Sequence, residues 1–162
     1  MIRFRRLCMA VGVAAALTVF AAPASAQVTY ALAGVEIAAT ETQGTFVGVA
    51  LAPDDFGTWG AVIVHDPLAS PAPEVTGGGF KINGQVRDLQ GIILPGGNIV
   101  RLGGSCRKEA FAVTGQVVLD DFVTFGAFGV KLTHYGFRLP TGGCFTYFAT
   151  VEGLITFALP SP

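Results

Sequence analysis

The sequence predicts an all-β fold, a single antiparallel β-barrel of about eight or nine strands that follows an N-terminal signal peptide. Three observations predict it. Beyond residue 26 no segment has the apolar spacing of a helix, apolar residues alternate or run continuously, and turn residues interrupt them about every ten positions. A β-sandwich fits the same pattern and stays open as the alternative.

The first 26 residues have the three parts of a secretory signal. Three arginines lie among the first six residues, an apolar stretch covers 11–22, and small residues at 24–26 suit a signal peptidase. We expect cleavage after Ala26, with a signal peptide over 1–26 and a single all-β domain over 27–162. The mature protein is then secreted or periplasmic, and a retained membrane anchor is the alternative.

Removal of the signal makes the chain acidic. Three of the ten basic residues and none of the eleven acidic ones lie in the signal, which leaves a net charge of −4. There is no basic stripe, so a nucleic-acid partner is not expected. Only 13% of the residues are charged and 51% are hydrophobic. This excess fits a filled interior, an apolar cavity, a lipid-facing surface or a subunit interface, so membrane association and an oligomer stay open.

Nine strands are expected, and glycines recur inside them, which favours the strong coiling of a closed barrel. The segment from Cys144 to Phe157 has the clearest period of two, and Phe145, Tyr147 and Ala149 are among the residues expected to face the core. Asn83-Gly84 predicts a two-residue hairpin turn. Pro-Gly-Gly at 95–97 and Asp-Asp at 120–121 predict further turns. The expected strands start near residues 28, 44, 57, 75, 85, 98, 107, 122 and 144.

Cys106 and Cys144 are the cysteines outside the signal, and they are expected to form a disulfide in an oxidising compartment. The chain-entropy model gives such a bridge about 4 kcal/mol. One strand is expected between them, and strands two apart lie about 9.6 Å from each other. We therefore expect the loop at 136–143 to bend so that Cys144 reaches Cys106.

His134 and Tyr135, at the end of an expected strand, are the candidates for acid–base catalysis at a cavity mouth. The alternative, which we favour, is that they cap the strand end. Adjacent strand residues face opposite ways, so the pair does not form a dyad. His65 is expected at the opposite edge of the barrel from His134, and no metal-binding spacing of histidines is present in the sequence. Neither a metal nor another cofactor is expected.

Ten aromatic residues lie on the expected strands, and most are expected in the core. In a barrel that its own side chains do not fill, they would line an apolar pocket. The ligand-binding candidates are Trp59, Phe111, Phe128 and Tyr147.

Three functions stay open. The favoured one is a non-enzymatic exported barrel that binds a small apolar ligand or a protein partner. The second is a small isomerase or cyclase that uses His134 or Tyr135. The third is a small outer-membrane β-barrel, although the expected strands lack the polar inner faces of that class.

Overall fold

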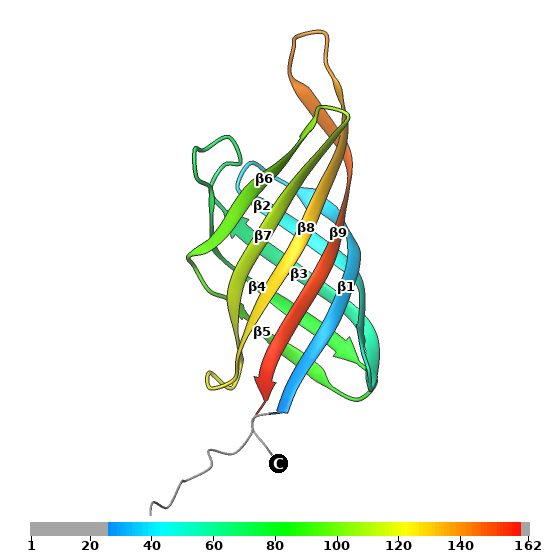
Figure 1. Cartoon of the computed structure of the whole chain (residues 1–162), viewed down its shortest axis with the longest axis vertical. Coiled ribbons are helices and arrows are strands. Elements are labelled where there is room, and N and C mark those ends of the chain that lie inside the picture. Colours follow the sequence, from blue (N-terminus) through cyan, green and yellow to red (C-terminus); the bar gives the residue numbers. More distant parts are fainter. Residues whose placement is uncertain (1–25, 160–162) are drawn as a thin grey trace, which may run out of the picture.

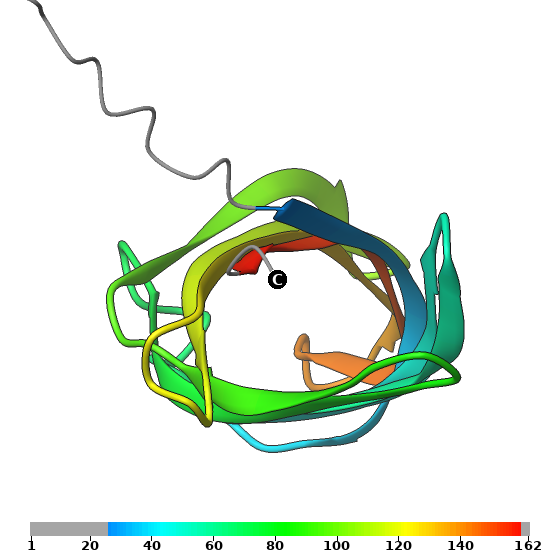
Figure 2. The same ribbon diagram turned by 90° about the horizontal axis from the view of Figure 1, so that it is seen from below.

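The chain folds into a closed antiparallel β-barrel, which confirms the predicted fold class. The computed structural model describes residues 26–159, and no helix occurs in that range. Viewed along its axis the barrel is a closed ring of strands, so the sandwich alternative is wrong (Figure 2). All but the last residue of the expected signal peptide lies outside the described residues. The strands are β1 (Ala26–Ala39), β2 (Gln43–Ala52), β3 (Asp55–His65), β4 (Glu74–Gly84), β5 (Asp88–Ile93), β6 (Gly97–Ser105), β7 (Lys108–Leu119), β8 (Phe125–Arg138) and β9 (Cys144–Leu159) (Figure 1).

One position in the barrel is shared by two strands. Both β4 and β7 pair with β5 over one part of their length and with β6 over another. The break between β5 and β6 falls at 94–96, where Pro95 has no N–H to donate and Gly96 has a φ of 93°. β5 and β6 therefore run in the same direction, and β9 closes the barrel by pairing with β1.

The shared position changes where the two histidines lie. Residues 95–97 do not reverse the chain, so β3 and β8 run in the same direction and end at the same edge. His65 and His134 consequently line one pocket, and the expectation that they lie at opposite edges is wrong. We call this end of the barrel the mouth. The other end, where β1 begins and β9 ends, is the base (Figure 1).

Inward-facing side chains fill the barrel. Along β1, Tyr30 and Leu32 are buried, whereas Ala31 and Ala33 are exposed, as the two-residue period of a strand requires. An apolar void of about 50 Å³ remains at the centre. By comparison, an engineered core cavity that binds benzene has a volume of about 150 Å³. The barrel is therefore packed and not hollow.

Only half of the ten aromatic residues on the expected strands belong to the core, so the expectation that most are buried is wrong. β9 begins beyond the barrel wall, and its alternating burial starts only at Ala149. The other exposed aromatic residues lie at the turn between β7 and β8. Buried are Phe46, Trp59, Phe111, Phe128 and Phe157; exposed are Phe122, Phe125, Phe145, Tyr147 and Phe148.

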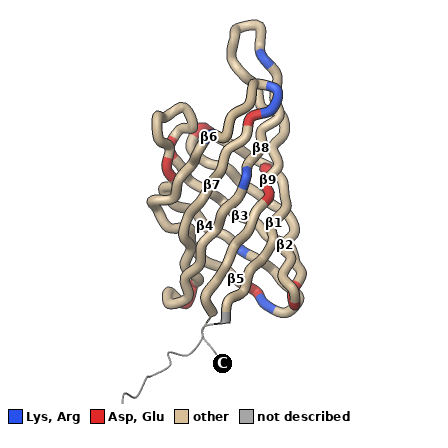
Figure 3. The backbone as a smooth tube through the Cα atoms, in the orientation of Figure 1, with Lys and Arg blue, Asp and Glu red and all other residues tan. Residues whose placement is uncertain are grey.

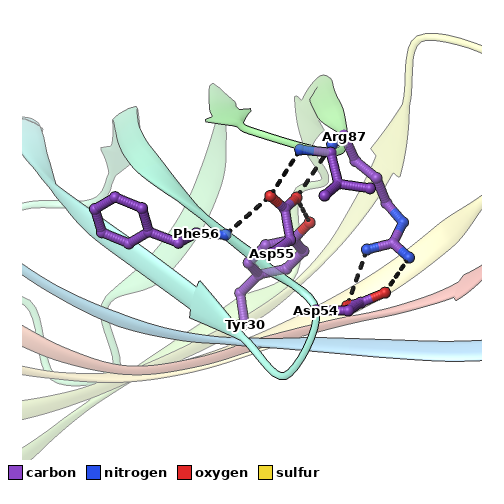
Figure 4. A network of polar contacts seen from close by, with 6 residues as sticks. Tyr30, Asp54, Asp55, Phe56 and Arg87 are labelled. Atoms are coloured by element: carbon purple, nitrogen blue, oxygen red, sulfur yellow. Dashed lines mark hydrogen bonds and ion pairs between the residues drawn. The ribbon is translucent and has the colours of Figure 1, made fainter.

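A hydrogen-bond network closes the base (Figure 4). The Asp55 carboxylate accepts a hydrogen bond from the Tyr30 hydroxyl at 2.7 Å. It also accepts three from backbone N–H groups, those of Phe56 at 2.9 Å, Val86 at 3.0 Å and Arg87 at 3.2 Å. The buried carboxylate thereby links β1 to the β2–β3 and β4–β5 turns. The Tyr30 hydrogen bond is the main cause that lowers the pKa of Asp55 to about 2.

The hairpin between β4 and β5 forms, but not with the expected Asn83-Gly84 turn. β4 continues through Gly84, and residues 85–87 make the turn, with Gly84 N–H donating to the carbonyl of Arg87 at 3.0 Å. A side chain at position 84 would collide with the carboxylate of Asp55. The glycine therefore makes room for the base network, and it does not supply a left-handed turn.

A disulfide joins Cys106 to Cys144, as the sequence predicts, with 5.5 Å between their Cα atoms. Its route differs from the expected one, because the β6–β7 turn crosses over β8 at Gly136. The Gly136 N–H donates to the carbonyl of Arg107 at 3.3 Å. A Cβ at Gly136 would lie only 2.8 Å from the carbonyl oxygen of Cys106. A glycine at this position therefore lets the turn reach across to β9.

Candidate functional site

A groove of about 750 Å³ opens at the mouth of the barrel. One side is the proline-rich loop at 66–73, which joins β3 to β4. The other side is the β6–β7 hairpin, which contributes Ile99, Val100 and Phe111. His134, near the end of β8, also lines the groove. The groove is large enough for a small organic ligand.

A smaller pocket, of about 50 Å³, adjoins the groove and leads into the barrel. Glu36, His65 and His134 line it together with core side chains. The groove and the pocket share Leu68, Ile99 and His134. Leu68 packs partly buried against the core. The proline-rich loop therefore places an apolar side chain at the boundary between the two spaces.

Glu36 and His134 form a carboxylate–imidazole pair at this boundary. Glu36 Oε2 lies 3.5 Å from His134 Nε2, and the side chains are 9% and 16% exposed. Within residues 26–159, His134 Nε2 is a buried atom without a hydrogen-bond partner. Neither carboxylate oxygen of Glu36 is a sealed atom of this kind, and an ionised carboxylate can accept about four hydrogen bonds. The pair is therefore a polar site with unused hydrogen-bonding capacity.

The immediate surroundings of the pair are mostly apolar, although His65 also lines the pocket and Glu74 lines the groove. The ring of Phe111 lies 5.5 Å from the His134 ring, centroid to centroid. Glu109, the cross-strand neighbour of His134, forms an ion pair with Arg101. Arg101 thus offsets the charge of Glu109, whereas the ion-pair partner of Glu36 among the described residues is His134, and a histidine carries charge only when protonated.

The two catalytic candidates lie on opposite faces of β8. His134 faces the groove and the pocket. Tyr135 packs against Phe148 on the projecting β8–β9 hairpin, 5.9 Å between ring centroids, and the Lys108 ammonium lies 5.8 Å from its ring. The structure does not bring His134 and Tyr135 into one site.

The four ligand-binding candidates lie in three different places. Trp59 and Phe128 line the central void. Phe111 lines the groove, and Tyr147 is 64% exposed on the projecting hairpin. Of the four, Phe111 is the one that lines the groove.

Sequence reasoning missed Glu36, although a signal was present. Glu36 has the same parity as Tyr30 and Leu32, so the alternation of β1 directs its carboxylate inward, beside buried apolar residues. Leu68 and the Arg101–Glu109 pair left no comparable signal. The position of Leu68 depends on the path of the β3–β4 loop. The Arg101–Glu109 ion pair lies beside a register shift in β6.

The chain matches no known protein family, no curated protein and no solved structure. Among residues 26–159, no three His, Cys, Asp or Glu side chains are grouped so that they could hold a metal ion. That same part of the chain has no helix with the length and hydropathy to cross a membrane.

Proposed function

We propose that the protein is an exported, non-enzymatic binding protein for a small amphiphile with a cationic, hydrogen-bond-donating head. The single observation behind this proposal is the Glu36 carboxylate. It is nine-tenths buried, it lines the pocket that adjoins the groove, and its ion-pair partner among the described residues is a histidine 3.5 Å away. A ligand ammonium would supply both the missing charge and the missing donors.

The shape of the mouth supports a ligand with two different ends. The pocket beside Glu36, at about 50 Å³, suits a head group of a few heavy atoms. The groove outside it is far larger and carries Ile99, Val100 and Phe111 on one side. An apolar tail would lie there and lose contact with water. The oxidising environment that suits the disulfide agrees with an exported protein.

The mouth supports this function better than the alternatives. A lipophilic ligand inside the barrel has little support, because the central void is only about 50 Å³. A membrane-spanning barrel is disfavoured because the interior is apolar, whereas such barrels have a polar lumen. For a small isomerase or cyclase that uses His134 or Tyr135, Tyr135 is disfavoured because it faces away from the groove, which leaves His134 as the acid–base candidate.

Isothermal titration calorimetry with hexylammonium, hexanol and hexanoate tests the proposal. These probes share one tail and differ in the charge of the head. We expect saturable binding of hexylammonium, weaker binding of hexanol and the weakest binding of hexanoate. Glu36→Gln keeps the shape of the side chain and removes its charge, so it should weaken hexylammonium binding about tenfold or more.

Glu152→Gln is the matched control, because Glu152 lies on the outer wall and pairs with Lys131 at 3.2 Å. It should leave hexylammonium binding unchanged. Near-ultraviolet circular dichroism should verify that both variants are folded. The proposal fails if hexylammonium gives no saturable heat, or if Glu36→Gln binds it as tightly as the unmodified protein.

A further inference from the structure

The β8–β9 hairpin presents a second surface that is independent of the proposed ligand site. Near the disulfide the hairpin leaves the barrel wall and projects past it (Figure 1). Four of its aromatic side chains are 44–64% exposed. Together with a partly buried fifth they form what we call the aromatic stripe: Tyr135, Phe137, Phe145, Tyr147 and Phe148.

The stripe lies on one face of the hairpin. Phe145 and Tyr147 pack against Phe137, with ring centroids 5.3 and 6.3 Å apart, and Phe148 packs against Tyr135 at 5.9 Å. Tyr135 and Phe137 are two residues apart on β8 and share a face. A register shift leaves Tyr147 as an extra residue on β9. Such a bulge redirects a side chain, and here it sets Tyr147 beside Phe137 and the next residue, Phe148, beside Tyr135.

This end of the molecule is also positively charged. Arg107, Lys108 and Arg138 are exposed here, and the segments 103–108 and 135–148 contain no acidic residue. They are three of the seven basic residues outside the expected signal, in a mature chain whose net charge is −4. Basic positions on and beside the projecting hairpin, and the scarcity of charge along the barrel wall, are visible in Figure 3.

We propose that the tip of the β8–β9 hairpin docks on an anionic lipid surface. Aromatic side chains favour the interface between lipid headgroups and acyl chains. Each Lys or Arg close to an anionic membrane strengthens binding by about fivefold. Stable attachment generally needs two such signals together, and the tip combines them on a projecting ridge.

The tip is held in shape before it meets a membrane. The disulfide fastens Cys144 to the β6–β7 turn, and the Leu139 N–H donates to the carbonyl of Gly143 at 2.7 Å across the end of the hairpin. Binding therefore costs little ordering entropy.

The base of the barrel provides an internal comparison. Phe122 and Phe125 are also exposed, at 69% and 55%. They lie beside Asp120 and Asp121, whose charges repel an anionic surface. Exposed aromatic residues thus occur at both ends, but only the tip combines them with uncompensated basic residues.

Vesicle flotation of the full mature chain tests the proposal. One set of vesicles contains phosphatidylcholine alone, and the other contains equal parts of phosphatidylcholine and phosphatidylglycerol. We expect binding to the second set that weakens as salt is added. The double variant Phe145→Ser/Tyr147→Ser should reduce this binding about tenfold or more, and Arg107→Gln/Arg138→Gln should do the same.

The matched control is Phe122→Ser/Phe125→Ser at the base, which should bind the anionic vesicles like the unmodified protein. Thermal unfolding verifies that each variant is folded. Three results would overturn the proposal: no flotation with anionic vesicles, equal flotation with phosphatidylcholine alone, or an equal loss in the base variant. None of these results bears on the binding of hexylammonium at the mouth, so the two proposals fail separately.

Discussion

The hydroxyl of Tyr30 donates a 2.7 Å hydrogen bond to the carboxylate of Asp55, and this contact joins the first strand to the turns that close the base. Tyr30 is fully buried, and Asp55 is the acceptor for three backbone N–H groups as well. Tyr30 and Asp55, which are 25 positions apart in the sequence, therefore lie together in a buried region at the base of the barrel. The charge of Asp55 is compensated there by donors and not by a buried cation.

Loss of the Tyr30 hydroxyl should destabilise the barrel less than loss of the Asp55 carboxylate. Tyr30→Phe deletes one hydrogen bond and leaves the three backbone donors in place, so we expect a loss of about 1–2 kcal/mol. Asp55→Ala leaves all four donors without an acceptor, so the loss should be about 3 kcal/mol or more. Urea unfolding measures both. A loss in Asp55→Ala no greater than in Tyr30→Phe would contradict this account of the base.

Stability should depend on pH at both extremes because of this pair. The pKa of Asp55 is about 2 in the folded chain, below its ordinary value of 3.8, so its contribution is present above about pH 4 and is lost as the pH falls toward 2. Burial, the largest cause, raises the pKa of Tyr30 from 10.0 to about 12, so stability is lost as the pH rises through that window. Unfolding midpoints measured against pH should show both slopes, and Tyr30→Phe should remove the alkaline one.

Loss of the disulfide should act on the projecting hairpin more than on the barrel. Replacing Cys106 and Cys144 by serine frees a loop of about 39 residues, at a cost of about 4 kcal/mol in the chain-entropy model. Amide hydrogen exchange should rise most in residues 136–148 and least in β1. Uniform acceleration over the whole barrel would show that the bridge does not act locally.

Two glycines on β8 allow a comparison between a position where a side chain would clash and a position where it would not. A Cβ at Gly136 would meet the backbone carbonyl oxygens of Phe145 and Cys106, whereas at Gly129 the nearest atom is Thr114 Cγ2 at 3.9 Å. Gly136→Ala should therefore cost about 1–3 kcal/mol through overpacking. Gly129→Ala should be neutral or slightly stabilising. Thermal unfolding compares them, and equal effects would contradict the proposed crossing of the β6–β7 turn over Gly136.

The strand pattern was readable from the sequence because alternation and turn residues are local signals. The nine expected strand starts lie within three residues of those observed. The direction of β6 was not readable, because Pro95 and Gly96 mark a break in a strand as readily as a reversal of the chain. Because of this ambiguity, His65 and His134 were expected at opposite ends of the barrel, whereas they lie at the same end.

The extent of the core was equally hard to predict. The alternation of β9 continues beyond the barrel, and nothing local to Phe145 or Tyr147 says where the wall ends. The mouth site also depends on long-range pairing, since Glu36 and His134 are 98 positions apart in the chain and come from strands that flank β9. The disulfide was predictable because few cysteines were available to pair.

The most direct test of the central claim is carbon-13 nuclear magnetic resonance of the glutamate carboxyl groups during titration with hexylammonium. We expect the Glu36 signal to shift and saturate while that of Glu152, on the outer wall, stays in place. A titration in which Glu36 does not shift, or in which it shifts no more than Glu152, would contradict the assignment of the mouth as a cation-binding site.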